Sequence, residues 1–155
     1  MTSWPIADVI PHAGEMILLD GIDEVEAERI VCLKAVQPDG LFQDADGNLP
    51  AWVGVELMAQ SIAAWAGCRA RAEQQPVQLG FLLGTRQYVC NVDAFPPGSH
   101  LRIEAERSFH DEHGMGVFSC RIDAPGIHAE ARLNVYRPPD ADAFFEQVAG
   151  ETPHG

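Results

Sequence analysis

The residue whose type and setting most suggest chemistry is Glu56, which stands inside an apolar run. Its neighbours are Val53, Val55, Leu57 and Met58. A carboxylate in such surroundings is costly to desolvate unless it is paired or protonated, as a catalytic acid would be. A glutamate in the first turn of a helix also stabilises the helix dipole while pointing into solvent. The residues alone leave both interpretations open.

A partner base would have to be one of six histidines: His12, His100, His110, His113, His128 and His154. His128 falls on the polar side of an alternating pattern. His110 and His113 enclose Asp111 and Glu112 like a group of metal ligands, but they lie in a glycine-rich turn, so we expect a solvated turn and no metal. His12 stands in an irregular segment where no pattern forces it outward, and a structural histidine that caps a loop fits it equally well.

Residues 49–75 contain the one long run with helical spacing and must position Glu56. The apolar residues that recur at steps of three and four are Val55, Met58, Ala59, Ile62 and Ala66. Asn48 is placed to cap the first turn, Pro50 suits that turn, and Pro76 ends the helix. We therefore predict one long, largely buried helix.

Alternating apolar patterns predict strands on both sides of this helix. Before it they cover residues 16–20, continued past Gly21 by a more polar segment, and residues 29–36, a pair that resembles a hairpin turning near residues 26–28. After it they cover residues 77–90, 101–106, 117–122 and 127–136. One helix wrapped by a curved antiparallel sheet is an α+β arrangement. We expect a single domain over residues 1–155, with a core at about 6–137 and a peripheral tail at 138–155 that includes one helical turn at 143–148.

The composition excludes some classes of function. The formal net charge is −13, and the ten Lys and Arg residues are scattered, which argues against a nucleic-acid surface. The cysteines are widely spaced among apolar neighbours, which is typical of reduced core residues: Cys32, Cys68, Cys90 and Cys120. The first residues lack the features of a secretory signal, and Glu56 interrupts the most apolar window, so we expect a cytoplasmic protein without a membrane span.

Three segments in series resemble the hot-dog-fold 3-hydroxyacyl-ACP dehydratases of fatty-acid synthesis. IPHAGEMILLDGIDEV (10–25) is similar to the opening of that family, PAWVGVELMAQ (50–60) to its active-site helix, and FLLGTRQYVCNVDAFPPGSHLRIEAE (81–106) to the strands that follow. The Ala51-Trp52 pair ahead of the helix motif resembles the predicted dehydratases of aryl-polyene-type pathways. The resemblance implies a single hot-dog domain that pairs with a second one, as a homodimer or as a heterodimer with another hot-dog dehydratase.

The resemblance also implies a reaction and a set of site residues. The reaction is dehydration of a 3-hydroxyacyl thioester on acyl carrier protein, with no cofactor beyond the phosphopantetheine of the carrier. Glu56 takes the position of the catalytic acid, and the residues expected to bind substrate are Trp52, Val53, Gly54, Leu83 and Gly84. The cations expected to meet the acidic carrier protein are Arg69, Arg71 and Arg86.

One position departs from the family pattern. The family's catalytic histidine precedes the glutamate by fourteen residues, where this sequence has Phe42, and residues 40–49 contain no histidine. Our hypothesis is that His12 replaces it and works with Glu56. The missing histidine is also consistent with two alternatives. One is a hot-dog thioesterase, which needs no histidine, and the other is an inactive subunit that partners an active dehydratase.

Overall fold

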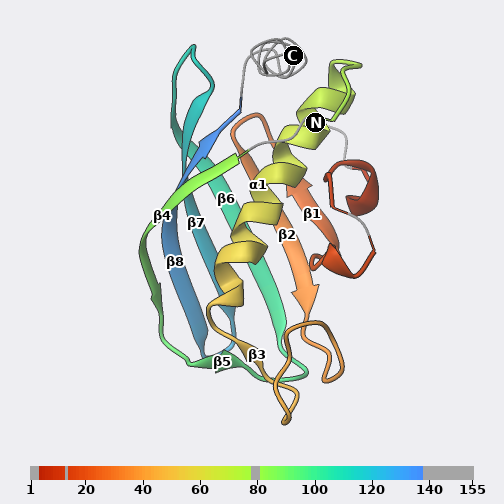
Figure 1. Cartoon of the computed structure of the whole chain (residues 1–155), viewed down its shortest axis with the longest axis vertical. Coiled ribbons are helices and arrows are strands. Elements are labelled where there is room, and N and C mark those ends of the chain that lie inside the picture. The colour runs from red at the N-terminus through yellow and green to blue at the C-terminus, as the bar shows by residue number, and fades with distance from the viewer. Residues whose placement is uncertain (1–3, 13, 78–80, 138–155) are drawn as a thin grey trace, which may run out of the picture.

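The protein is a six-stranded antiparallel sheet curved around one long helix, α1 (Figure 1). The computed structural model describes residues 4–12, 14–77 and 81–137, with the backbone alone for 81–83. The strands of the sheet, in spatial order, are β1 (Gly21–Val25), β2 (Arg29–Ala35), β6 (His100–His110), β7 (Met115–Ala124), β8 (Ile127–Tyr136) and β4 (Phe81–Cys90). The helix α1 spans Val53–Ala72. The predicted α+β fold is confirmed, with two strands before the helix and four long ones after it.

The core lies between α1 and the concave face of the sheet. Strand β7 illustrates the alternation that builds it, because Phe118, Cys120 and Ile122 are buried while Ser119 and Arg121 are exposed. Successive residues of a strand point to opposite faces, so this pattern gives the sheet one apolar side and one wet side. Within the described ranges, no helix is long and apolar enough to cross a membrane.

The strand predicted at residues 16–20 is wrong. A short 3-10 helix occupies Gly14–Met16, irregular backbone follows, and the first strand of the sheet begins at Gly21. Leu18 is buried, as an apolar run requires, but its N–H donates to the side chain of Gln60 on α1 and not to a neighbouring strand. The backbone N–H groups of a buried apolar segment can donate to a side-chain amide as well as to a neighbouring strand. The pattern of apolar residues does not distinguish these two kinds of hydrogen bond.

The predicted start of the helix is also wrong. Leu49–Pro50 form a short strand, β3, that pairs with β5 (Ala94–Phe95), and the helix begins only at Val53 with Trp52 as its N-cap. Asn48 makes no cap, because it lies four residues before the N-cap and no described side chain caps this helix; its backbone N–H donates to Asp44 Oδ1 in the preceding loop. The last helical residue is Ala72, and β4 begins at Phe81, later than the predicted residue 77. The helical turn predicted at 143–148 lies outside the described residues.

The N-terminal segment packs directly on α1 through a glycine. A Cβ built on Gly67 would lie 1.8 Å from the carbonyl oxygen of Val9, so no larger residue fits while the segment stays in place. Val9 itself is fully buried. The backbone contact between Gly67 and Val9 therefore holds residues 4–12 beside the helix.

We predict that Gly67→Ala destabilises the protein. Alanine favours a helix over glycine by about 1 kcal/mol, yet the clash with Val9 should outweigh this gain and leave a net loss of about 1–3 kcal/mol. Urea unfolding measures the change. Gly84→Ala is the matched control, because a Cβ there meets nothing within 4 Å. Equal stability of Gly67→Ala and the parent protein would show that the segment does not depend on this contact.

We predict that the cysteines differ sharply in reactivity. Burial raises the pKa of Cys32 and of Cys120 to about 12 and raises the pKa of Cys68, whereas Cys90 is only half-buried. Because the thiolate is the reactive form, alkylation of the folded protein near neutral pH should label Cys90 first. Mass spectrometry of peptides after timed alkylation checks this, with urea-unfolded protein as the control in which all four react. Labelling of Cys32 as fast as Cys90 would contradict it.

Candidate active site

His12 of the N-terminal segment lies beside Glu56, which is in the first turn of α1. The distance from His12 Nε2 to Glu56 Oε1 is 3.6 Å, which is an ion-pair distance and slightly longer than a hydrogen bond. The side chain of His12 is 27% exposed and that of Glu56 is 41% exposed. Two groups able to transfer protons therefore border the same accessible space, although Glu56 is less buried than its apolar neighbours in the sequence suggest.

Gln60, one helical turn after Glu56, connects this carboxylate to the N-terminal segment. Its side chain is fully buried. Its amide nitrogen donates to Met16 O at 2.7 Å and to Glu56 Oε1 at 3.2 Å, and its amide oxygen accepts from Leu18 N at 2.9 Å. Both donors and the acceptor of one buried amide are thus in use, which fixes Glu56 and the chain around residue 16 relative to each other.

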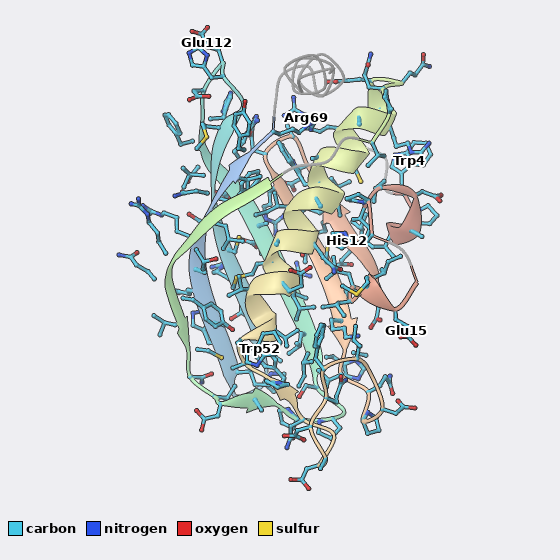
Figure 2. All side chains as sticks on the ribbon, in the orientation of Figure 1. Trp4, His12, Glu15, Trp52, Arg69 and Glu112 are labelled. Atoms are coloured by element: carbon cyan, nitrogen blue, oxygen red, sulfur yellow. The ribbon has the colours of Figure 1, made fainter. Side chains whose placement is uncertain are left out.

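His12 lies between three points at which its segment is attached to α1. Val9 packs on Gly67, Arg71 donates two hydrogen bonds to the carbonyl of Asp8, and Gln60 binds the backbone of Met16. Figure 2 shows His12 on the side of α1 that faces this segment. Attachment before and after His12 brings a residue forty-four positions away in sequence to Glu56.

The imidazole of His12 is held without a fixed tautomer. Its Nδ1 is buried and has no hydrogen-bond partner among the described residues, while Nε2 faces Glu56. A partner on one ring nitrogen normally decides which nitrogen carries the proton. With none in the described chain, Nε2 can present either a lone pair or an N–H to the accessible space beside Glu56.

The other candidate histidines are less suited to act as a base with Glu56. His128 bonds Asp123 and Glu130 at 2.7 Å each, and these hydrogen bonds, Asp123 first, raise its pKa and favour the protonated form. His110 lies at the far end of β6, His113 in the next turn, and His100 at the start of β6. His154 lies outside the described residues. Within those residues, no group of three or more His, Cys, Asp and Glu side chains is arranged to hold a metal ion.

The residues predicted to bind substrate surround the start of α1 in different ways. Trp52 is 62% exposed, whereas Val53 is buried and lines a hollow of about 400 Å³ with Leu18 and Leu41. Gly54 is required for close packing, because a Cβ there would lie 2.3 Å from the hydroxyl of Tyr88.

Two further predicted substrate-binding residues lie in β4. Gly84 stands at an irregularity of this strand, beside open space. Leu83 is in the same strand, and its side chain is outside the described residues. The structure therefore places these two residues on the edge strand of the sheet and not on the helix.

Phe42, where the family has its histidine, contacts the predicted site through Trp52. Its ring lies edge-on to the Trp52 ring, with centroids 5.6 Å apart, and 39% of the residue is exposed. Its backbone has φ = 74°, a left-handed conformation that is costly for a bulky residue. An aromatic surface thus replaces an ionisable group at this position.

The three arginines predicted to bind a carrier protein do not form one cluster. Arg69 lies over the ring of Trp65, and Arg71 lies over the ring of Trp4 while bonding Asp8. Arg86 is in β4, opposite Arg132 of β8. The three residues therefore lie at different places in the fold, two on α1 and one on β4.

Gln60 and Tyr88 are residues that sequence reasoning missed. Gln60 follows Glu56 by four residues, the spacing at which side chains on a helix meet. A glutamine among apolar residues of a buried helix needs hydrogen-bond partners, and this could have marked it in the sequence. Tyr88 donates a hydrogen bond to the carbonyl of Ala51, just before the helix. No local pattern marks Tyr88, because it lies thirty-seven residues away in β4.

A single helix enclosed by one curved antiparallel sheet, with a glutamate and a histidine at the start of that helix, is the arrangement of a hot-dog-fold protein. The chain belongs to the ApeP-like family, that of the ApeP dehydratase, whose sequence model matches residues 4–146. The resemblance to hot-dog dehydratases identified from the sequence is confirmed. A comparison with curated proteins gave no significant match.

Solved structures agree with this assignment. A chain of the dehydratase heterocomplex ApeI:P from Xenorhabdus doucetiae is 32% identical, with a TM-score of 0.83, and the match covers 95% of this chain and 99% of that one. The E. coli PaaI protein of the phenylacetic acid degradation operon is 12% identical, with a TM-score of 0.59 over 75% of this chain and 81% of that one. A hypothetical thioesterase from Streptococcus pneumoniae is 15% identical, with a TM-score of 0.54 over 74% and 82%. The last two share the fold alone.

We predict that Gln60→Met destabilises the protein and loosens the segment around His12. Methionine fills a similar volume but leaves the N–H of Leu18 and the carbonyl of Met16 without partners, at a cost of about 2 kcal/mol or more. Urea unfolding and hydrogen exchange at Leu18 measure the two effects. Gln43→Met is the control, since in the described part of the chain this amide makes one hydrogen bond, to Gln37 O of the same exposed loop, and its buried Oε1 has no partner to lose. Similar losses in both variants would contradict the role given to Gln60.

Proposed function

We propose that this protein dehydrates a 3-hydroxyacyl thioester, carried on acyl carrier protein, to the trans-2-enoyl thioester. Membership of a dehydratase family supports the class of reaction. The observation that carries the assignment to residues is the 3.6 Å approach of His12 Nε2 to Glu56 Oε1 at the start of α1.

The proposed reaction removes water across C2 and C3 with one base and one acid. His12 Nε2 takes the proton from C2, the C2–C3 double bond forms, and the C3–O bond breaks as protonated Glu56 gives its proton to the leaving hydroxyl. His12 is then an imidazolium and Glu56 a carboxylate. Their separation suits return of the proton from Nε2 to Oε1, directly or through the product water, which restores both groups.

The thioester oxygen gains negative charge during the reaction and needs donors. The start of a helix offers backbone N–H groups and the positive end of its dipole. The amides of Gly54 and Val55 already donate to the carbonyls of Ala51 and Trp52, so the oxygen would bind amides that precede them. We place the thioester beside Trp52 and Val53 for this reason.

We also propose that the working form is a heterodimer with a second hot-dog dehydratase. The similar chain of 32% identity comes from a heterocomplex. In this chain β4 is an edge strand of the sheet, and its Val89 is 66% exposed. A second subunit on this edge would cover apolar surface and pair the free side of the strand.

We predict that Glu56→Gln and His12→Gln each lower the rate of dehydration by about 100- to 10,000-fold, the usual contribution of a general acid or base. The assay follows enoyl formation and free thiol release from a 3-hydroxyacyl carrier thioester, with the chain alone and with a co-expressed second subunit. His113→Gln, in an exposed turn, is the control. Urea unfolding verifies that the variants fold.

Several outcomes of the same assay would contradict the proposal. Thiol without enoyl product would identify a thioesterase, and neither product with or without the second subunit would identify a non-catalytic partner. Full activity of His12→Gln would remove His12 from the mechanism. Equal turnover of the matching coenzyme A thioester would remove the carrier protein from the proposal.

A further inference from the structure

A cavity of about 250 Å³ lies beside the C-terminal half of α1, between the helix and the upper ends of β6, β7 and β8. Its floor is apolar, formed by Ile62, Trp65, Phe118 and Val135. Three guanidinium groups line its wall, those of Arg69, Arg107 and Arg137. Figure 2 shows Arg69 near the end of α1, far from Trp52 at the other end. Glu73 and Asp111 line the cavity as well, so it combines an apolar floor with a charged rim.

This cavity is separate from the site around Glu56. Arg69 follows Glu56 by thirteen residues, which corresponds to about 20 Å along a helix and to directions roughly 140° apart around its axis. Glu56 faces the N-terminal segment, whereas Arg69 faces β6 and β7 across the cavity. A ligand in the cavity therefore does not touch the proposed catalytic pair of the same chain.

Two cations share one aromatic ring at this cavity. The guanidinium of Arg69 lies 5.0 Å from the centre of the Trp65 ring, and that of Arg107 lies 4.8 Å from the same ring. Arg107 is neutralised by two hydrogen bonds to Glu28, at 2.6 and 2.8 Å. Arg69 has no carboxylate within ion-pair distance in the described part of the chain. Its charge acts at longer range, since it contributes, after the hydrogen bond from Arg107, to the lowered pKa of Glu28.

Charges of both signs surround the cavity, since Glu73 and Asp111 line it beside the three arginines. The pKa of Arg137 is lowered, first by burial and then by the charge of Arg69, with Glu73 acting against both. Asp111 also lines the cavity, but its carboxylate already accepts the N–H groups of His113 and Met115 in the turn. Three of the ten Lys and Arg residues meet here in a chain of net charge −13.

Helix stability alone does not explain where Arg69 points. Cations in the last turn of a helix are stabilising, and both Arg69 and Arg71 fall there. Arg71 turns to the carbonyl of Asp8 and the ring of Trp4. Arg69 instead lies over the Trp65 ring at the cavity. Its charge would stabilise the helix dipole equally well in another direction.

We propose that this cavity binds a small organic oxyanion. Arg69 would hold a carboxylate or phosphate group, and an apolar or aromatic body attached to that group would lie on Trp65 and Ile62. Guanidinium groups bind both kinds of oxyanion well, because their donors match the oxygen pair. This site adds a second binding function to the reaction proposed at Glu56 and does not depend on it.

Calorimetric titration of the full chain with four probes tests the proposal. Phenylacetate and phenyl phosphate should each bind one to one, whereas 2-phenylethanol, which lacks the anion, and inorganic phosphate, which lacks the body, should bind at least about tenfold more weakly. If only one phenyl anion binds, the result supports the site and assigns it to carboxylates or to phosphates. Binding of neither anion, or equal binding of 2-phenylethanol, would overturn the proposal.

Variants locate the site. Arg69→Gln should weaken binding of the phenyl anion about tenfold to a hundredfold, as for loss of a hydrogen bond to a charged group, and Arg69→Lys should retain part of it. Arg71→Gln is the matched control in the same turn and should leave affinity unchanged. Glu56→Gln should also leave it unchanged, so failure of the catalytic proposal would not affect this result. The assignment would be wrong if Arg69→Gln bound the phenyl anion as tightly as the parent protein. It would also be wrong if Arg71→Gln lowered the affinity as much as Arg69→Gln does.

Discussion

The amide of Gln60 is the interaction on which the geometry of the candidate site depends. It is fully buried, and it binds Glu56 on its own helix and the backbone at Met16 and Leu18 on another segment. A buried amide without partners is costly, so the protein keeps all three hydrogen bonds or loses stability. The same constraint that keeps the segment on α1 therefore keeps His12 opposite Glu56.

Helix α1 separates two chemically different environments. Its first turns carry Glu56 beside His12, where the helix dipole favours negative charge and can polarise a carbonyl oxygen. Its last turns carry Arg69 at a cavity with an apolar floor, where its guanidinium lies over the Trp65 ring. One buried helix thus supports the proposed site for proton transfer at one end and the proposed site for anions at the other.

The sequence predicted the class of fold and the position of Glu56 on the long helix correctly, for physical reasons that act locally. Apolar residues recur at every second position in β7 and β8, and at steps of three and four around Ile62. The first period is that of a strand with one buried face, and the second is that of a helix. The same reasoning failed at residues 16–20 and at Leu49–Pro50. There the backbone is satisfied by Gln60 and by β5, which come from elsewhere in the chain.

What the sequence determined by itself is therefore the sheet wrapped around one helix, the place of Glu56 on that helix, and the absence of a histidine at Phe42. Only the tertiary structure decided that His12 meets Glu56, because that approach depends on backbone contacts at Gly67 and on the amide of Gln60. It also separated Arg69 from Arg71, two residues apart in sequence. Side-chain direction depends on packing with distant segments, and no local pattern records it.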